Sequence, residues 1–231
     1  MALEGLVRLL RKSAPRRLEA GEAYDLWAEN YPPCPHNPLM EAEQSVVARL
    51  IADRAAGRLR RALDVGTGTG RCLPLLAAAG ARLVVGVDMS RAMLAKQTFR
   101  APRLCADACH LPFRDAAFEL VSSSLMVGDV DDLRGWITEA ARVLARGGSL
   151  VYSDFHPSWA DQGWKRTFRT AGGQLMELGF HPHAIEEHLA LLEGASLEVR
   201  AIREPRVAGG ETPVVAVFHA VKRGPGTPGK Q

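Results

Sequence analysis

Short, mostly apolar runs alternate with amphipathic stretches through the middle of the chain. The run RLVVGVD at 82–88 is nearly all apolar, which is typical of a strand in a parallel sheet with both faces covered. Residues 131–148 place apolar side chains, among them Trp136 and Leu144, at helical spacing, and Gly147 ends the stretch. The pattern predicts helices over 71–80, 90–99 and 131–148 and strands over 61–66, 82–88, 102–107, 118–124 and 149–155.

The last third of the chain follows a different pattern. A helix is predicted over 184–195, and two strands, 197–205 and 213–223, follow it with little chain between them. Strands joined by so short a connection pair as an antiparallel hairpin. Repeated strand–helix units followed by such a hairpin indicate an α/β fold with a doubly wound, mostly parallel sheet of seven strands.

Two segments lie outside this sheet. Residues 1–55 are predicted to form an N-terminal helical lid, and residues from about 156 to 183 an insertion after the fifth strand. Ligands of open α/β sheets bind beyond the carboxyl ends of the strands, where both segments can cover them. The predicted organisation is a lid over 1–55, a ligand-binding domain over 56–222 and a disordered tail over 223–231.

Composition excludes several classes of protein. The net charge of +3 is small and the Lys and Arg residues are scattered, which does not favour nucleic acid as a partner. No apolar run approaches the ~20 residues that span a bilayer, and residues 1–17 indicate a short amphipathic helix rather than a secretory signal. The four cysteines form no C-x-x-C pair, and CADACH at 105–110 has one residue too many for C-x-x-C-H. We therefore expect no metal, reduced thiols and a cytoplasmic location.

The stretch ALDVGTGTG at 62–70 sets three glycines behind an acid. The G-x-G-x-x-G fingerprint fails here, because Arg71 or Leu73 stands where the third glycine should be, and no G-K-[ST] of a phosphate loop is present. What remains is a loop whose backbone can approach a ligand with no Cβ in the way. Asp64 can hold a cationic amine, and the helix start after Gly70 favours a carboxylate.

Two further acids end the next strands. Asp88 ends the second strand, where a carboxylate suits a ribose diol and repels a 2′-phosphate. Asp107 ends the third strand and can accept a hydrogen bond from the exocyclic amine of a base. A ligand with an amine, a carboxylate, a ribose and an adenine but no phosphate is S-adenosylmethionine. It is the predicted cofactor, with S-adenosylhomocysteine as its product.

Four motifs follow one another from about Leu63 to Phe155. They are LDVGTGTG, VVGVDMSRAML, ADACHLPFRDAAFELV and ARVLARGGSLVYSDF. In order and spacing they resemble the motifs of the class I S-adenosylmethionine-dependent methyltransferases, which have a Rossmann-like fold. The loop FELVSSSLMVGDVDDL is similar to a subgroup that holds malonyl-carrier-protein O-methyltransferases and ubiquinone/menaquinone C-methyltransferases. That subgroup carries a bulky aromatic residue or a histidine where Gly128 and Asp129 stand here.

This resemblance adds roles to the residues already identified. It implies that Met89 packs on the ribose–adenine side, that Asp107 and Ala108 meet the adenine, and that Ser124 lies near the sulfonium. The expected cofactor site, from the loop and the resemblance together, comprises Asp64, Gly66, Thr67, Gly68, Gly70, Asp88, Met89, Asp107, Ala108 and Ser124.

Candidates for chemistry and for the substrate pocket lie in the two covering segments. In the first, Tyr24 or Tyr31 is expected to touch cofactor or substrate, or else to pack the lid. In the second, His156 is the candidate general base, because an imidazole titrates near neutrality; the alternative is a histidine that caps the strand. The expected substrate pocket, whose aromatic residues have ordinary packing as their alternative, comprises Trp27, His36, Asp154, Trp159 and Trp164.

The function predicted from these observations is methyl transfer to a small or medium organic acceptor. Oxygen of a hydroxyl or carboxyl group is slightly favoured, and no N-P-P-Y tetrad follows the fourth strand to indicate an amide or nucleobase nitrogen. The alternatives are a non-catalytic protein that binds the cofactor and an aminopropyl transferase. The expected partner is a small-molecule substrate, with no nucleic acid and no membrane, and the chain is a monomer or a homodimer.

Overall fold

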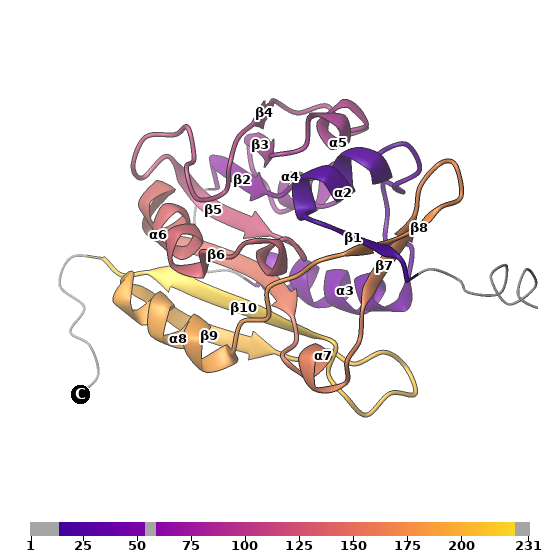
Figure 1. Ribbon diagram of the computed structural model, residues 1–231. Coiled ribbons are helices and arrows are strands. Elements are labelled where there is room, and N and C mark those ends of the chain that lie inside the picture. Colours follow the sequence, from indigo (N-terminus) through magenta and orange to yellow (C-terminus); the bar gives the residue numbers. More distant parts are fainter. Residues whose placement is uncertain (1–13, 54–58, 225–231) are drawn as a thin grey trace, which may run out of the picture.

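The computed structural model describes residues 14–53 and 59–224, and a seven-stranded sheet forms its centre (Figure 1). Its strands are β2 (Arg61–Val65), β3 (Leu83–Asp88), β4 (Arg103–Cys105), β5 (Phe118–Ser123), β6 (Leu144–Phe155), β9 (Leu197–Arg203) and β10 (Val215–Lys222). The strand order is β4-β3-β2-β5-β6-β10-β9, and β2 to β6 run parallel. Strand β10 is antiparallel to both β6 and β9, which confirms the predicted fold class and its terminal hairpin.

Helices cover both faces of the sheet. Helices α6 (Leu133–Val143) and α8 (Ile185–Gly194) bury Trp136 and Leu192 against one face, in a core that includes Leu63 of β2. Helices α3 (Pro38–Ala52) and α4 (Leu73–Ala78) cover the opposite face. The short helix α5 (Arg91–Ala95) follows β3, with Ser90 accepting a hydrogen bond from the backbone N–H of Met93 at its N-cap.

The predicted boundary between the helix over 131–148 and the strand after it was wrong. The helix expected to reach residue 148 ends at Val143, and β6 begins at Leu144, before the two glycines. Gly147 adopts a φ of +75°, and a Cβ at Gly148 would lie 2.8 Å from the carbonyl oxygen of Ala145. The glycine pair therefore forms a tight bend near the start of β6. In the sequence, such a pair looks the same as a glycine that ends a helix.

A second, smaller sheet joins the two segments outside the main sheet. Strand β1 (Arg16–Leu18) pairs in parallel with β8 (Leu175–Leu178), and β8 pairs antiparallel with β7 (Arg166–Arg169). The sequence did not predict these strands, because three or four residues are too few to show a period of two. Around them Leu18, Phe168 and Met176 pack with the helix α2 (Ala20–Trp27).

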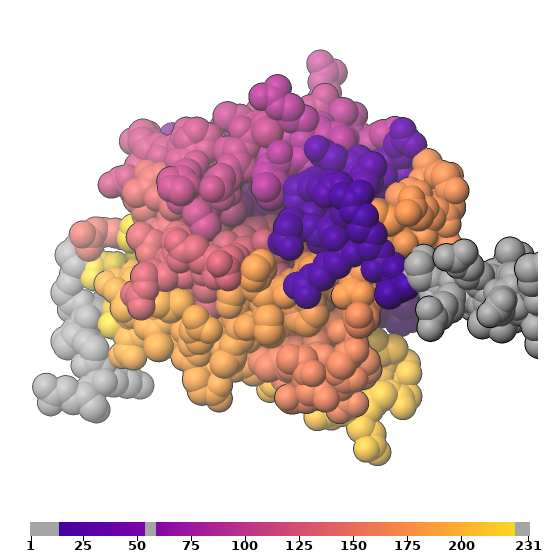
Figure 2. Space-filling view, viewed as in Figure 1, coloured from indigo at the N-terminus to yellow at the C-terminus, as the bar shows by residue number. Residues whose placement is uncertain are grey.

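The N-terminal segment lies over the carboxyl edge of the main sheet. Figure 2 shows it, in indigo, on the molecular surface between the magenta segments around α5 and the orange strands β7 and β8. Helix α2 contacts both α5 and β8. Within the described residues, no helix is long and apolar enough to cross a membrane. The division into a lid, a ligand-binding domain and a tail stays a prediction, and parts of the lid and most of the tail lie outside the described residues.

Candidate active site

A cavity of about 830 Å³ lies at the carboxyl ends of the parallel strands. Val65, Asp88 and Phe155, which end β2, β3 and β6, line its floor and walls. Residues of α2 and of the insertion line it from the other side, so both covering segments contribute to one cavity. Its volume lies within the range of ~300–1,000 Å³ that is usual for small-molecule and cofactor sites.

The glycine loop gives the cavity a wall of bare backbone. Gly66 and Gly68 adopt φ angles of +68° and +54°, in the left-handed region that favours glycine. A Cβ at Gly66 would lie 2.3 Å from Cγ of Met126, whereas one at Gly68 would meet no atom of the described residues within 4 Å. Gly66 is therefore required by packing, and Gly68 leaves space where a ligand can approach the main chain.

Asp88 ties this loop to the next strand. Its Oδ2 accepts from the backbone N–H of Gly68 at 2.7 Å and its Oδ1 from that of Ser90 at 2.8 Å. Burial raises the pKa of Asp88, and these two N–H groups oppose the rise. The carboxylate is held in a fixed orientation at the cavity wall and keeps further acceptor positions for a diol.

Asp107 and Met89 stand beyond Asp88 on the same wall. Asp107 accepts from the backbone N–H of Cys109 at 2.9 Å and lies 3.1 Å from Nδ1 of His110, and the N–H and the imidazole lower its pKa. Met89 lines the cavity with 58% of its surface exposed, although it is apolar. The exposed thioether of Met89 suits the flat, apolar face of the adenine of the predicted cofactor, and the carboxylates beside it suit the ribose hydroxyls and the adenine amine.

Asp64 is the deepest acid of the site. It is 1% exposed, lies within β2, and its Oδ1 accepts from the hydroxyl of Ser122 at 2.6 Å. Burial raises the pKa of Asp64 to about 6. A cationic group in the cavity would stabilise the ionised carboxylate, which fits the sulfonium and ammonium charges of S-adenosylmethionine.

A buried polar cluster behind the glycine loop was missed by the sequence analysis. Glu43 of α3 has no exposed surface, and its Oε2 lies 3.1 Å from Nη1 of Arg71. Arg71 also donates to the hydroxyl of Ser124 at 3.1 Å, and Glu43 accepts from the hydroxyls of Ser124 and Ser153. Ser124, predicted near the sulfonium, thus lines the cavity, and its hydroxyl is bound by Arg71 and by the buried Glu43. One signal in the sequence could have predicted this cluster: Glu43 stands three residues after Met40, at a position of an amphipathic helix that normally faces the core.

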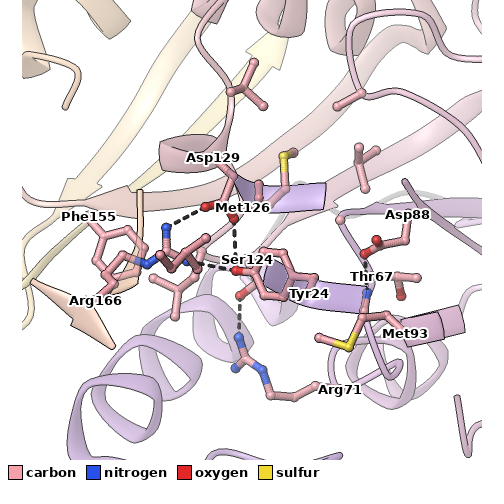
Figure 3. A pocket seen from close by; sticks show the side chains of 18 of the residues that line it. Tyr24, Thr67, Arg71, Asp88, Met93, Ser124, Met126, Asp129, Phe155 and Arg166 are labelled. Atoms are coloured by element: carbon pink, nitrogen blue, oxygen red, sulfur yellow. Dashed lines mark hydrogen bonds and ion pairs between the residues drawn. The ribbon is translucent and has the colours of Figure 1, made fainter. Parts of the chain in front are cut away.

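The opposite end of the cavity is built from residues far apart in the sequence. Figure 3 shows Asp88 and Thr67 at one end and Asp129, Arg166 and Phe155 at the other, with Tyr24 between them. Tyr24 donates to Oδ2 of Asp129 at 2.9 Å, and Arg166 donates to Oδ1 of Asp129 and to the Tyr24 hydroxyl. The guanidinium of Arg166 lies 4.4 Å from the centre of the Phe155 ring. Asp129 and Arg166 were not among the predicted site residues.

Aromatic side chains of the N-terminal segment form the neighbouring wall. Trp27 lies edge to face with Tyr31 at 4.8 Å between ring centres and stacks on Phe168 of β7 at 4.9 Å. Tyr24, Trp27, Tyr31 and His36 all line the cavity. Burial raises the pKa of both tyrosines, that of Tyr24 the more strongly, so their phenols stay protonated at neutral pH.

The structure brings most of the predicted site residues to the cavity and leaves four away from it. Gly70, Asp154, His156 and Trp164 are not among its lining residues. His156 follows Phe155, whose ring faces the cavity, and successive side chains of a strand point to opposite sides. The Nε2 of His156 lies 2.9 Å from Glu204, and its Nδ1 accepts from the backbone N–H of Ser158.

Asp154 and Trp164, which also do not line the cavity, contact other residues instead. Asp154 is buried, with Oδ2 3.2 Å from Nε2 of His188 and Oδ1 accepting from the backbone N–H of Phe155. Trp164 packs edge to face on Trp159, which does line the cavity. The alternative considered for His156, a strand-end histidine bonded to backbone, describes its observed position.

Comparison with known proteins bears on the same part of the chain. Residues 63–152 match a family described as a methyltransferase domain. The malonyl-[acyl-carrier protein] O-methyltransferase of Halorhodospira halophila is 36% identical over 166 residues, 60% of this chain and 56% of that protein. The 27-O-demethylrifamycin SV methyltransferase of Amycolatopsis mediterranei is 30% identical, over 61% of this chain and 60% of that protein. The chain thus matches little more than half the length of these curated relatives.

Solved structures share the fold. An S-adenosylmethionine-dependent methyltransferase from Mesorhizobium loti superposes with a TM-score of 0.64 and 21% identity, covering 79% of this chain and 99% of that one. The [4+2]-cyclase SpnF superposes with a TM-score of 0.65 and 20% identity, covering 91% of this chain and 99% of that one. These superpositions show that the chain shares its fold with S-adenosylmethionine-dependent methyltransferases. The part of the chain that matches the methyltransferase domain family, residues 63–152, runs from β2 into β6.

Proposed function

We propose that this protein transfers the methyl group of S-adenosylmethionine to a small or medium organic acceptor, with an oxygen atom as the favoured nucleophile. The observation that carries the proposal is one continuous cavity, which runs from the glycine loop to the aromatic residues of the two covering segments. A site for the cofactor alone would not need that second, mostly apolar end. Malonyl-carrier-protein and demethylrifamycin methyltransferases among the relatives are consistent with an oxygen acceptor.

The residues at the glycine-loop end would hold the cofactor. Asp88 offers acceptors to the ribose hydroxyls, Asp107 to the adenine amine, and the open space at Gly68 admits the methionine part. Asp64 would face its cationic groups. When bound, the cofactor supplies a sulfonium methyl: the acceptor's lone pair forms the new bond to carbon, and sulfur keeps the electrons of the broken one.

The chain's own contribution to such a reaction is positioning and exclusion of water. Tyr24, Trp27 and Tyr31 wall the cavity with aromatic surface, and Phe155 and Trp159 close it from the insertion side. Because their pKa values are raised, the two tyrosines act as hydrogen-bond donors rather than as bases near neutrality.

The proposal is tested by measuring S-adenosylhomocysteine formation with a panel of hydroxyl, carboxyl, amine, thiol and carbon nucleophiles. Calorimetric titration of S-adenosylmethionine and S-adenosylhomocysteine accompanies it. Binding of both with product from at least one acceptor class supports the enzyme. Binding without product across the whole panel would instead favour a non-catalytic, cofactor-binding protein.

Three further properties belong to the proposal. The free, unpaired state of Cys34, Cys72, Cys105 and Cys109 is consistent with a cytoplasmic protein of small-molecule metabolism. The acid-rich cavity lining supports a small-molecule partner rather than nucleic acid. Whether the chain is a monomer or a homodimer is decided by light scattering.

A further inference from the structure

We propose that the acceptor is an apolar molecule that presents a neutral hydroxyl group, not a carboxylate, to the buried pair of Asp129 and Arg166. This inference rests on the proposed function and narrows its substrate class. It depends on three features of the acceptor end of the cavity: the charge of the pair, the hydrogen-bonding positions that the pair leaves, and the charge of the surrounding wall.

The positive charge of Arg166 is already compensated. Its side chain is 9% exposed and that of Asp129 is 6% exposed, and the two form an ion pair. The second arm of the guanidinium donates to the hydroxyl of Tyr24 at 2.8 Å, and its face covers Phe155. A carboxylate acceptor would normally bind an arginine by two parallel hydrogen bonds. Here Arg166 is already paired with the carboxylate of Asp129.

The same pair retains positions that suit a hydroxyl. A carboxylate has about four acceptor positions, and Asp129 uses one from Tyr24 and one from Arg166. A guanidinium has five N–H donors, of which the two bonds to Asp129 and Tyr24 engage two. A hydroxyl group both donates and accepts, so it can bond to both partners, whereas a second carboxylate can only accept and would lie beside Asp129.

The formal charge of the cavity wall favours the same class. Within the described residues, six aspartates but only three cationic side chains, Arg71, Lys165 and Arg166, line the cavity. This excess of negative charge attracts the cationic cofactor and repels an anionic acceptor. The apolar lining near Arg166 includes Phe155, Trp159 and Val214, which suits an aromatic or aliphatic body behind the hydroxyl.

The test compares molecules that differ only in the polar group. The probes are 2-naphthol with 2-naphthoate and 4-phenylphenol with biphenyl-4-carboxylate, titrated at neutral pH by calorimetry in the presence of S-adenosylhomocysteine. We expect the wild-type protein to bind each phenol at least tenfold more tightly than its carboxylate. Tighter or equal binding of the carboxylates, or no binding of either member of both pairs, would overturn the inference.

Two variants separate recognition from overall charge. Asp129→Asn releases Arg166, and we expect the preference to shift by tenfold or more toward the carboxylates. Asp161→Asn removes the same charge from an exposed aspartate that does not line the cavity and is not bonded to Arg166, and we expect the preference to stay. Equal shifts in the two variants would overturn the assignment to the pair. If Asp129→Asn does not fold, the wild-type comparison still decides the acceptor class.

The outcomes also distinguish this inference from the proposed function. Failure of the wild-type protein to bind S-adenosylhomocysteine counts against the methyltransferase itself. Binding of S-adenosylhomocysteine together with a preference for the carboxylates counts only against the neutral acceptor.

Discussion

Glu43 and Arg71 form a buried ion pair, 3.1 Å from Oε2 to Nη1, between helix α3 and the end of the glycine loop. Glu43 has no exposed surface, and the hydroxyls of Ser124 and Ser153 donate to its other oxygen, Oε1. The pair therefore joins four chain segments: α3, the glycine loop, and the carboxyl ends of β5 and β6. It supports the glycine-loop wall of the cavity from behind, so its loss should lower both the stability of the protein and its affinity for a ligand in that cavity.

Replacement of Glu43 by alanine is expected to lower the free energy of unfolding by about 3–5 kcal/mol, because Arg71 is left buried without its partner. Glu43→Gln keeps acceptors for the two serines and should cost less. Urea unfolding followed by circular dichroism measures both, with Glu41→Ala as the control, because Glu41 is exposed on the same helix. Equal stability of the Glu43 and Glu41 variants would contradict the assignment.

Asp64 is expected to make stability depend on pH between about 4 and 6. Burial raises the pKa of Asp64 to about 6, so the folded protein binds this proton more tightly than the unfolded chain does. Stability therefore falls as pH rises through this window, by up to about 3 kcal/mol at ~1.4 kcal/mol per pH unit. Asp64→Asn lacks this carboxylate and should gain stability relative to wild type as pH rises.

Urea unfolding across the window measures that difference. The matched control is Asp161→Asn, which replaces an exposed aspartate. A difference between Asp64→Asn and wild type that does not change with pH would show that Asp64 is not protonated in the folded state near pH 5. The experiment uses protein without cofactor, since a bound cation would favour the ionised carboxylate.

Asp88→Ala is expected to abolish measurable binding of S-adenosylmethionine, a loss of at least about 100-fold. The change removes the carboxylate that is predicted to hold the ribose and also the acceptor of the Gly68 and Ser90 N–H groups. Asp88→Asn, which keeps one acceptor oxygen, should lose less. Calorimetry at neutral pH measures both, and retention of wild-type affinity in the alanine variant would remove Asp88 from the cofactor site.

The sequence predicted the main sheet and the acids at the glycine-loop end of the cavity for the same physical reason. Strands of this sheet are apolar runs of visible length, and their carboxyl ends gather at one edge. Asp64, Asp88 and Asp107 each lie at or within two residues of the carboxyl end of one of these strands, which places them at that edge. Because each lies within a local motif, no distant contact had to be known.

The acceptor end has no such local signal. Tyr24 lies in helix α2, Asp129 in the short 3-10 helix Val127–Asp129 and Arg166 in strand β7, and Tyr24 and Asp129 are 105 positions apart. Strands as short as β1 and β7 show no alternation of apolar and polar residues. The sheet that carries Arg166 therefore could not be predicted from the sequence. His156 was favoured as a base from its residue type and place after the strand, but the alternation of side chains along β6 directs it away from the cavity.

His156→Ala is therefore expected to leave turnover within about threefold of wild type, with any acceptor that yields product. The imidazole pairs with Glu204, whose side chain is 46% exposed, and such pairs contribute about 0–1 kcal/mol to stability. Steady-state kinetics and thermal unfolding of His156→Ala and Glu204→Ala should thus give two similar, mildly affected proteins. A tenfold or greater loss of kcat in His156→Ala alone, with cofactor affinity unchanged, would instead show that the imidazole turns into the cavity during turnover and serves as the base.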